Sequence, residues 1–508
     1  MGARAASLSR PEASPRARAA PHLRRAEAAF AAQSLPEALA ETRAALAHDP
    51  AQAAAHAMFG RIALALGQGE LALAPLHKAL TLDPDCTPAS HALGRLLQDR
   101  DGVEAGLPWL ERAARQDAPS RHHADLSCAY AGLGRFADAI AAAEAAVRAD
   151  PECAIAWTNR AYALAQLGRT SEALAAYDEA LALQPEHAIA QYGRACVLLR
   201  AGDYERGWPA YEWRWRGRQE PRRDIAAPPW AGETLAGRTI LLHGEQGLGD
   251  VVMFARFAPQ LARRGARVIV QAYPHLLRLL GTLEGVAALL PPGTALPPVD
   301  CHAPLGSLPH LLGVRLESLS GAPYLSVPDE AARAWQTLRP AGWRRDGGLV
   351  VGLAWAGAAR DHRGAASPFD ARRSIPPGLL APLLGTPGVR FVCLQAGEAR
   401  DAARRAGLPL LDVMEGVRDF ADTAARLADI DLLITVDTAI AHVAGALGRP
   451  VWLLSRFDGC WRWLEGREDS PWYSSARLFR QPAPGDWKSV IDTVAGELAG
   501  AIGTAAGG

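Results

Sequence analysis

The chain has 508 residues with equal numbers of basic and acidic side chains, so its formal net charge is 0. This length is too great for one hydrophobic core and predicts about two to four domains. The balanced charge provides no general attraction to nucleic acid or to an anionic membrane, and no apolar run is long enough for a transmembrane helix. The seven cysteines are dispersed without a C-x-x-C pair, which indicates reduced thiols in the cytoplasm.

Residues 1–21 consist mainly of Arg, Ala, Ser and Pro and lack the apolar segment of a secretory signal. Pro11 and Pro15 interrupt any amphipathic helix in this segment. We therefore expect a disordered tail over 1–21, with an organellar transit peptide as the alternative.

A repeat occupies residues 22–218. Pro50 and Pro84 are 34 residues apart, as are Pro151 and Pro185, and each proline ends a block of two helical patterns. Small residues recur at matching places in these blocks: Gly60, Ala72, Ala79, Gly94, Ala139, Ala146, Ala161 and Ala173. This pattern resembles the tetratricopeptide (TPR) repeat. The resemblance implies an α solenoid of helical hairpins whose groove binds a protein or peptide ligand. Packing against the rest of the chain, or oligomerisation, is the alternative role.

The end of the repeats is expected near residues 217–221. Aromatic residues precede this boundary: Trp208, Tyr211, Trp213 and Trp215. Aromatic residues among arginines are found in nucleic-acid binding segments, but Glu205, Glu212 and Glu220 interrupt the positive charge. We therefore expect an interface that caps the solenoid, and no nucleic-acid partner.

Strands alternate with helices in residues 219–345. A strand over 239–243, a turn over 244–250, a helix over 251–263 and a strand over 267–271 predict a βαβ unit with a parallel sheet. The glycines of the turn run G-x-x-G-x-G, which is not the order of a dinucleotide-binding loop. Gly247 and Gly249 allow a ligand close to the backbone. Asp250 would repel phosphate and is suited to a hydroxyl, as hydrogen-bond acceptor or general base, or to capping the helix.

A second α/β half occupies residues 346–508, with strands expected at 349–355, 390–394, 431–436 and 451–454. A polar loop over 356–373 follows the first of these strands and carries Arg360, Arg363, Arg372 and Arg373. Long loops at such positions are often functional. We expect at least one of these arginines, Arg373 first, to bind a phosphate.

The third of these strands runs into a predicted helix at Asp437 and Thr438. Free N–H groups at a helix start, together with the helix dipole, favour an anion. Ala439 is small enough for a phosphate to approach, and His442 lies one turn further on the same side. An N-capped helix with a buried histidine is the alternative interpretation.

Several motifs occur in one order along residues 225–495: Gly244–Asp250, Trp355–Gly357, Arg373–Ile375, Leu394–Gln395, Asp419–Thr423 and Asp437–Pro450. Together they resemble the family 9 glycosyltransferases, the ADP-heptose:lipopolysaccharide heptosyltransferase superfamily, in the branch that is fused to TPR repeats. The resemblance implies a GT-B fold of two Rossmann-like halves with parallel sheets. The first half would hold the acceptor and the second half the nucleotide-diphosphate sugar.

The resemblance also implies an inverting, metal-independent transfer of a sugar to a hydroxyl of a glycan or protein. Asp250 would be the catalytic base. The nucleotide-sugar site would comprise Gly247, Gly249, Trp355, Arg373, Gln395, Asp437, Thr438, Ala439 and His442. No cofactor besides the sugar nucleotide and no metal is expected, because Asp429-Ile430-Asp431 fits a turn better than the D-x-D of metal-dependent transferases.

Two other functions compete with this prediction. Ala358 stands where the family often has Asn, and Pro368 makes the loop irregular, which favours a TPR interaction scaffold with a degenerate transferase-like domain. The glycine order weakens a third function, that of an NAD-dependent dehydrogenase. We expect the protein in the cytoplasm, and peripheral attachment to the inner membrane face stays open.

Overall fold

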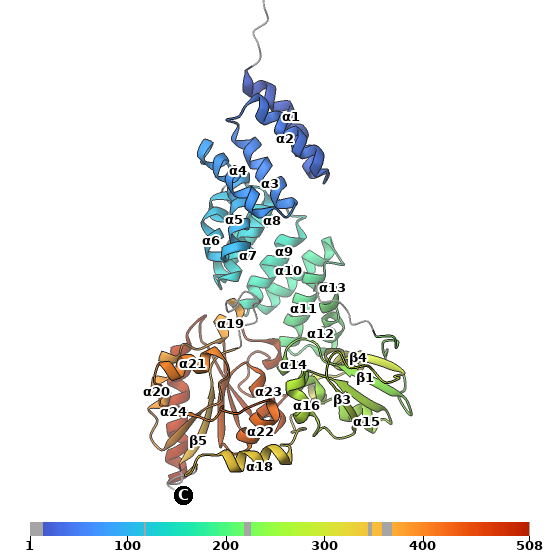
Figure 1. Ribbon diagram of the computed structural model, residues 1–508, viewed down its shortest axis with the longest axis vertical. Coiled ribbons are helices and arrows are strands. Elements are labelled where there is room, and N and C mark those ends of the chain that lie inside the picture. Colours follow the sequence, from blue (N-terminus) through green and yellow to red (C-terminus); the bar gives the residue numbers. More distant parts are fainter. Residues whose placement is uncertain (1–13, 116–117, 218–224, 344–347, 358–367, 507–508) are drawn as a thin grey trace, which may run out of the picture. The chain divides into compact units, whose positions relative to one another are not determined.

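The computed structural model describes residues 14–115, 118–217, 225–343, 348–357 and 368–506. The chain divides into two compact units (Figure 1). Unit 1 comprises residues 1–163 and 182–184, and unit 2 comprises residues 164–181 and 185–508. The predicted boundaries at 218/219 and 345/346 fall on residues outside the described ranges, so these boundaries stay predictions.

The predicted helical hairpins are present. Their helices are α1 (Pro15–Ala31), α2 (Leu35–His48), α3 (Ala53–Ala65), α4 (Gly69–Leu82), α5 (Thr87–Asp101), α6 (Val103–Ala113), α7 (Ser120–Gly132), α8 (Phe136–Ala149), α9 (Ala154–Gln166), α10 (Thr170–Leu183), α11 (Ala188–Arg200), α12 (Tyr204–Tyr211) and α13 (Arg214–Gly217). Small residues let paired helices touch: a Cβ on Gly60 would lie 2.5 Å from Leu76 Cγ, and one on Gly94 would lie 2.9 Å from Leu110 Cγ. The small residues that recur with the repeat therefore lie where the two helices of a hairpin pack closely.

Helix α1 extends into the segment that we assigned to the tail. Ser14 caps the helix, its side chain accepting a hydrogen bond from the Ala17 N–H, and Pro15 occupies the first helical position. Proline is well suited to that position because its missing N–H would have no partner there. Residues 15–21 are thus helical, and residues 1–13 lie outside the described part.

The first sheet of unit 2 has four parallel strands in the order β3-β2-β1-β4. They are β1 (Thr239–His243), β2 (Arg267–Gln271), β3 (Val286–Leu290) and β4 (Cys301–Pro304), with helices α14 (Leu248–Ala255), α15 (Ala258–Arg263), α16 (Pro274–Leu280), α17 (Leu308–Leu311) and 3₁₀ turns η1 (Leu305–Ser307) and η2 (Leu316–Ser318). The prediction of a single helix over 251–263 is wrong. The segment is divided into α14 and α15 because Pro259 has no N–H for the carbonyl of Ala255.

The second sheet has six parallel strands in the order β10-β9-β8-β5-β6-β7. They are β5 (Leu349–Ala354), β6 (Val389–Cys393), β7 (Leu411–Asp412), β8 (Leu432–Val436), β9 (Val451–Ser455) and β10 (Ala476–Arg480). The helical segments around them are α18 (Asp329–Leu338), α19 (Pro368–Arg373), η3 (Pro377–Leu380), α20 (Ala381–Leu384), α21 (Glu398–Arg405), α22 (Phe420–Ala428), α23 (Ala439–Ala446), η4 (Trp461–Trp463) and α24 (Trp487–Ala506). The strand order reverses between β5 and β8, where open α/β sheets bind ligands.

The last repeat hairpin belongs to the core of unit 2. Tyr204, Trp208 and Tyr211 of α12 are buried together with Phe254 of α14 and Trp472. The Trp472 indole donates a hydrogen bond of 3.0 Å to the Tyr204 hydroxyl. Of the four aromatic residues expected to cap the solenoid, Trp208 and Tyr211 therefore form part of this hydrophobic core, whereas Trp213 and Trp215 are only partly buried. None of the helices within the described ranges is both long and apolar enough to span a bilayer.

Candidate active site

The start of α23 has the predicted strand–turn–helix geometry. Strand β8 is fully buried and ends at Val436, and Thr438 is the N-cap of α23 in extended conformation. The Thr438 side chain makes no capping hydrogen bond and instead donates to the Val436 carbonyl at 3.3 Å. The side chain thus leaves the helix start open to an anion, although the Ala441 N–H already donates to the Thr438 carbonyl at 3.0 Å.

Arg373 reaches the same point from α19. Its Nη1 donates a hydrogen bond of 3.1 Å to the Asp437 carbonyl, and its Nη2 pairs with Asp370. A Cβ on Gly357 would lie 2.3 Å from Arg373 Nε, so only glycine permits this approach. The structure thus places Arg373 beside the helix start, as expected of a phosphate ligand. Ala358, Arg360 and Arg363 lie outside the described residues.

His442 is buried in α23, with 4% of its surface exposed. Its Nδ1 lies 3.0 Å from the Tyr473 hydroxyl, its Nε2 lies 4.0 Å from Asp437 Oδ1, and its ring stacks on Trp463. Burial lowers the pKa of His442 to about 4, so the ring is neutral at pH 7. The histidine is thus a buried core residue that borders the helix start, and its binding to the diphosphate stays a prediction.

The Gly-rich turn of the first half lies against this histidine. A Cβ on Gly249 would lie 2.6 Å from His442 Cδ2, and Gly247 is the N-cap of α14. The space that Gly249 opens is therefore occupied by the His442 ring, where we had expected a ligand. Gln246 adopts a left-handed φ of 62°, an uncommon conformation for a side-chain-bearing residue. The Tyr273 hydroxyl holds this conformation by donating to the Gln246 carbonyl at 2.7 Å.

The Asp250 carboxylate has two partners, a backbone N–H group and a guanidinium group. One carboxylate oxygen accepts a hydrogen bond of 2.9 Å from the Gly247 N–H, which is the capping role that the sequence left open. The other oxygen pairs with the guanidinium of Arg462. Both side chains are 14% exposed. A general base at this position would have to accept a proton on an oxygen that already has a partner.

Arg462 is the partner that our sequence analysis missed. Its guanidinium lies over the Trp461 ring at 4.4 Å, and Nη1 donates to Cys460 Sγ at 2.9 Å. Burial lowers the pKa of Arg462, but Asp250, Cys460, Tyr211 and Asp437 together outweigh this effect and hold the pKa well above its usual value. The only available signal was the alternation of aromatic and basic residues in Trp461-Arg462-Trp463.

Gln395 and Trp355 contact the chain itself. The Gln395 Oε1 accepts hydrogen bonds from the Trp355 and Ala356 N–H groups, both at 2.9 Å, and its Nε2 donates to the Ala356 and Ala396 carbonyls. The Trp355 side chain is 2% exposed within the core of the second sheet. These two residues join the ends of β5 and β6, and their binding to nucleotide stays a prediction.

Asp429 and Asp431 lie at the opposite edge of the sheet from the start of α23. Asp429 accepts a hydrogen bond of 3.0 Å from the Trp335 indole, and Asp431 accepts one of 2.8 Å from the Val350 N–H. These contacts match the predicted role in a turn. Within the described ranges, no group of three or more His, Cys, Asp or Glu side chains is arranged to hold a metal ion.

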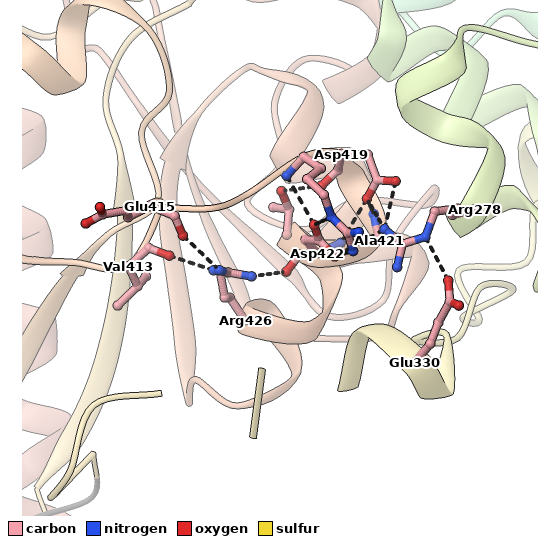
Figure 2. Close-up of polar contacts among 10 residues, drawn as sticks. Arg278, Glu330, Val413, Glu415, Asp419, Ala421, Asp422 and Arg426 are labelled. Atoms are coloured by element: carbon pink, nitrogen blue, oxygen red, sulfur yellow. Dashed lines mark hydrogen bonds and ion pairs between the residues drawn. The ribbon is translucent and has the colours of Figure 1, made fainter. Parts of the chain in front are cut away.

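A polar network joins the first half to the second at α22 (Figure 2). Arg278 of α16 pairs with Glu330 at 2.8 Å, with Asp419 at 2.9 Å and with Asp422 at 3.2 Å. Asp419 is the N-cap of α22, so that helix starts at Phe420. Burial raises the pKa of Asp422, but hydrogen bonds from Arg418 and Arg278 outweigh it and lower the pKa to about 2. Asp422 is therefore ionised at neutral pH.

Comparisons with known proteins match both parts of the chain. Residues 124–184 and 166–212 match the tetratricopeptide repeat family model, and residues 388–454 match the model of glycosyltransferase family 9 (heptosyltransferase). The second match extends from the start of β6 into β9 and includes the start of α23. The predicted TPR repeats and the family 9 resemblance are thereby confirmed.

Three individual proteins that resemble this chain are between 13% and 28% identical to it. Protein FlbA of Caulobacter vibrioides is 28% identical over 492 residues, which span 83% of this chain and 80% of FlbA. A family 9 glycosyl transferase from Veillonella parvula is 13% identical, with a TM-score of 0.40 over 53% of this chain and 98% of its own. The TPR protein YrrB is 24% identical, with a TM-score of 0.29 over 35% of this chain and 91% of its own.

Proposed function

We propose that this protein, with its TPR repeats and its region of glycosyltransferase family 9, transfers a sugar from a nucleotide-diphosphate sugar to a hydroxyl of a glycan or protein. The transfer would invert the anomeric centre and need neither metal nor cofactor. The observation that carries this proposal is the convergence of the α23 start, Arg373 and His442 at the strand-order reversal between β5 and β8. The repeats would recruit the acceptor or another protein, in the cytoplasm or at the inner membrane face.

The chemistry divides between the two halves of unit 2. The acceptor oxygen bonds to the anomeric carbon while the bond from that carbon to the diphosphate breaks, and the acceptor proton passes to a base. Asp250 is the proposed base, a role worth about 10²–10⁴-fold in rate. The α23 N–H groups and Arg373 would stabilise the departing diphosphate without a metal ion.

The pairing of Asp250 with Arg462 sets a condition on this mechanism. Both oxygens of Asp250 are engaged, one with the Gly247 N–H and the other with Arg462. To reach Asp250, the acceptor hydroxyl must therefore displace Arg462 or bind the same carboxylate oxygen as Arg462. The same pairing favours the second candidate function, an interaction scaffold in which Asp250 is purely structural.

Thermal unfolding with nucleoside diphosphates separates the two functions. We expect one of ADP, GDP, UDP, CDP and dTDP to stabilise the protein by about 2.7 kcal/mol at 100 times its dissociation constant. His442→Gln should weaken this stabilisation, whereas Asp250→Asn should preserve it and abolish sugar transfer. No stabilisation by any diphosphate would favour the scaffold, and full turnover by Asp250→Asn would exclude Asp250 as the base.

A further inference from the structure

Unit 1 contains a cavity of about 610 Å³ between α1, α3 and α7, which we call the Arg61 cavity. Its lining includes the apolar Phe30, Leu35 and Ala65 and the charged Glu27, Arg61 and Arg121. The volume lies in the range typical of pockets that enclose a ligand. The lining combines an apolar floor with two guanidinium groups and one carboxylate, so the cavity is suited to a ligand with both apolar and charged parts.

Arg61 is the unusual member of this lining. Its guanidinium carbon lies 4.6 Å from the centre of the Phe30 ring, and the residue is half-buried. Burial lowers the pKa of Arg61, and the charge of Glu27 only partly opposes this. No carboxylate in the described part of the chain lies within ion-pair distance of Arg61. A partly desolvated guanidinium that stacks on an aromatic ring is already oriented for a planar anion.

The neighbouring repeats extend the positive charge. Arg95 lies one 34-residue period after Arg61, at the same place in α5. Arg95 and Arg121 lie 3.8 and 4.0 Å from Asp125, and the same carboxylate lies closer to His91 Nε2, at 2.7 Å. The cations around the cavity therefore exceed the carboxylates that neutralise them. An acidic ligand is complementary to this surface.

We propose that the Arg61 cavity binds an acidic side chain in an extended segment of a partner protein. The carboxylate pairs with Arg61 and is attracted by Arg121, and a neighbouring apolar side chain of the segment packs on Phe30, Leu35 and Ala65. This inference rests on the partner-recruiting role proposed for the repeats. It is independent of whether unit 2 transfers a sugar, because no residue of unit 2 takes part.

The test is binding of the full-length protein to an array of capped peptides of varied sequence, without any sugar nucleotide. We expect the bound peptides to be enriched in Asp or Glu beside an apolar residue. Arg61→Gln should weaken binding about tenfold or more, since a hydrogen-bonded charge pair contributes about 1.5–3 kcal/mol. The matched control is Arg43→Gln on α2, an exposed arginine outside the cavity, which makes the same change in charge.

Three outcomes would overturn the proposal. They are binding without preference for acidic residues, equal losses in Arg61→Gln and Arg43→Gln, and binding of a single-stranded oligonucleotide with no binding of acidic peptides. Circular dichroism of both variants establishes that the repeats stay folded, and Arg61→Lys, which keeps the charge, should retain part of the binding. Peptide binding with no nucleotide-induced stabilisation would favour the scaffold over the transferase and leave this inference standing.

Discussion

At the scale of single residues, the pairing of Asp250 with Arg462 is the main determinant of what the candidate site can do. Arg462 lies in the second half and Asp250 in the first, 212 positions apart in the sequence. Both side chains are largely buried, so water screens their interaction little. The pair therefore joins the proposed base to the opposite side of the site.

We predict that Arg462→Gln destabilises the protein strongly, because it leaves the Asp250 carboxylate buried without its cation. The expected loss is about 3–5 kcal/mol of unfolding free energy, measured by chemical denaturation with tryptophan fluorescence. Arg467→Gln is the matched control, since Arg467 pairs with an Asp469 that is 70% exposed, and surface pairs contribute about 0–1 kcal/mol. Equal losses in the two variants would show that the Asp250 pair is structurally unimportant.

At the scale of elements, the contact between α14 and α23 brings the two predicted motifs together. Gly249 lies at this contact, and the His442 ring fills the space beside it. A glycine at this position is thus required by helix packing, whatever its role toward a ligand. Helix starts from both halves consequently meet at one place.

We predict that Gly249→Ala separates these helices. The added Cβ would lie 2.6 Å from His442 Cδ2, so one helix must shift. Overpacking of this kind costs about 1–3 kcal/mol, which would appear as a lower melting temperature and weaker nucleotide-induced stabilisation. Gly496→Ala in the exposed face of α24, where the new Cβ meets no atom within 4 Å, should be neutral or stabilising. A Gly249→Ala protein as stable as Gly496→Ala would contradict the close packing.

At the scale of the whole molecule, Arg278 links the two sheets of unit 2 through α16 and α22 (Figure 2). Arg278→Gln should destabilise unit 2 by about 1–3 kcal/mol, because it removes hydrogen bonds to three carboxylates. Hydrogen exchange should accelerate at the first turn of α22, which Asp419 caps. Arg263→Gln, whose partner Glu284 is 4.0 Å away and 88% exposed, should change neither property. Unchanged exchange in Arg278→Gln would exclude a link between the halves.

Local patterns in the sequence determined the repeats and the individual motifs. The 34-residue period required small residues where hairpin helices touch, as at Gly60 and Gly94. An apolar run followed by helical spacing was enough to predict β8 and α23. Such patterns are readable because strand and helix periodicities depend only on neighbouring residues.

Only the tertiary structure decided which distant residues meet. The pairing of Asp250 with Arg462, the filling of the Gly249 space by His442 and the merging of α12 into the core of unit 2 all join segments far apart in the chain. These contacts depend on strand order and helix packing, which cannot be predicted from the periodicity of the sequence. The sequence alone thus identified candidate groups, and the packing of unit 2 determined which of them are engaged with one another.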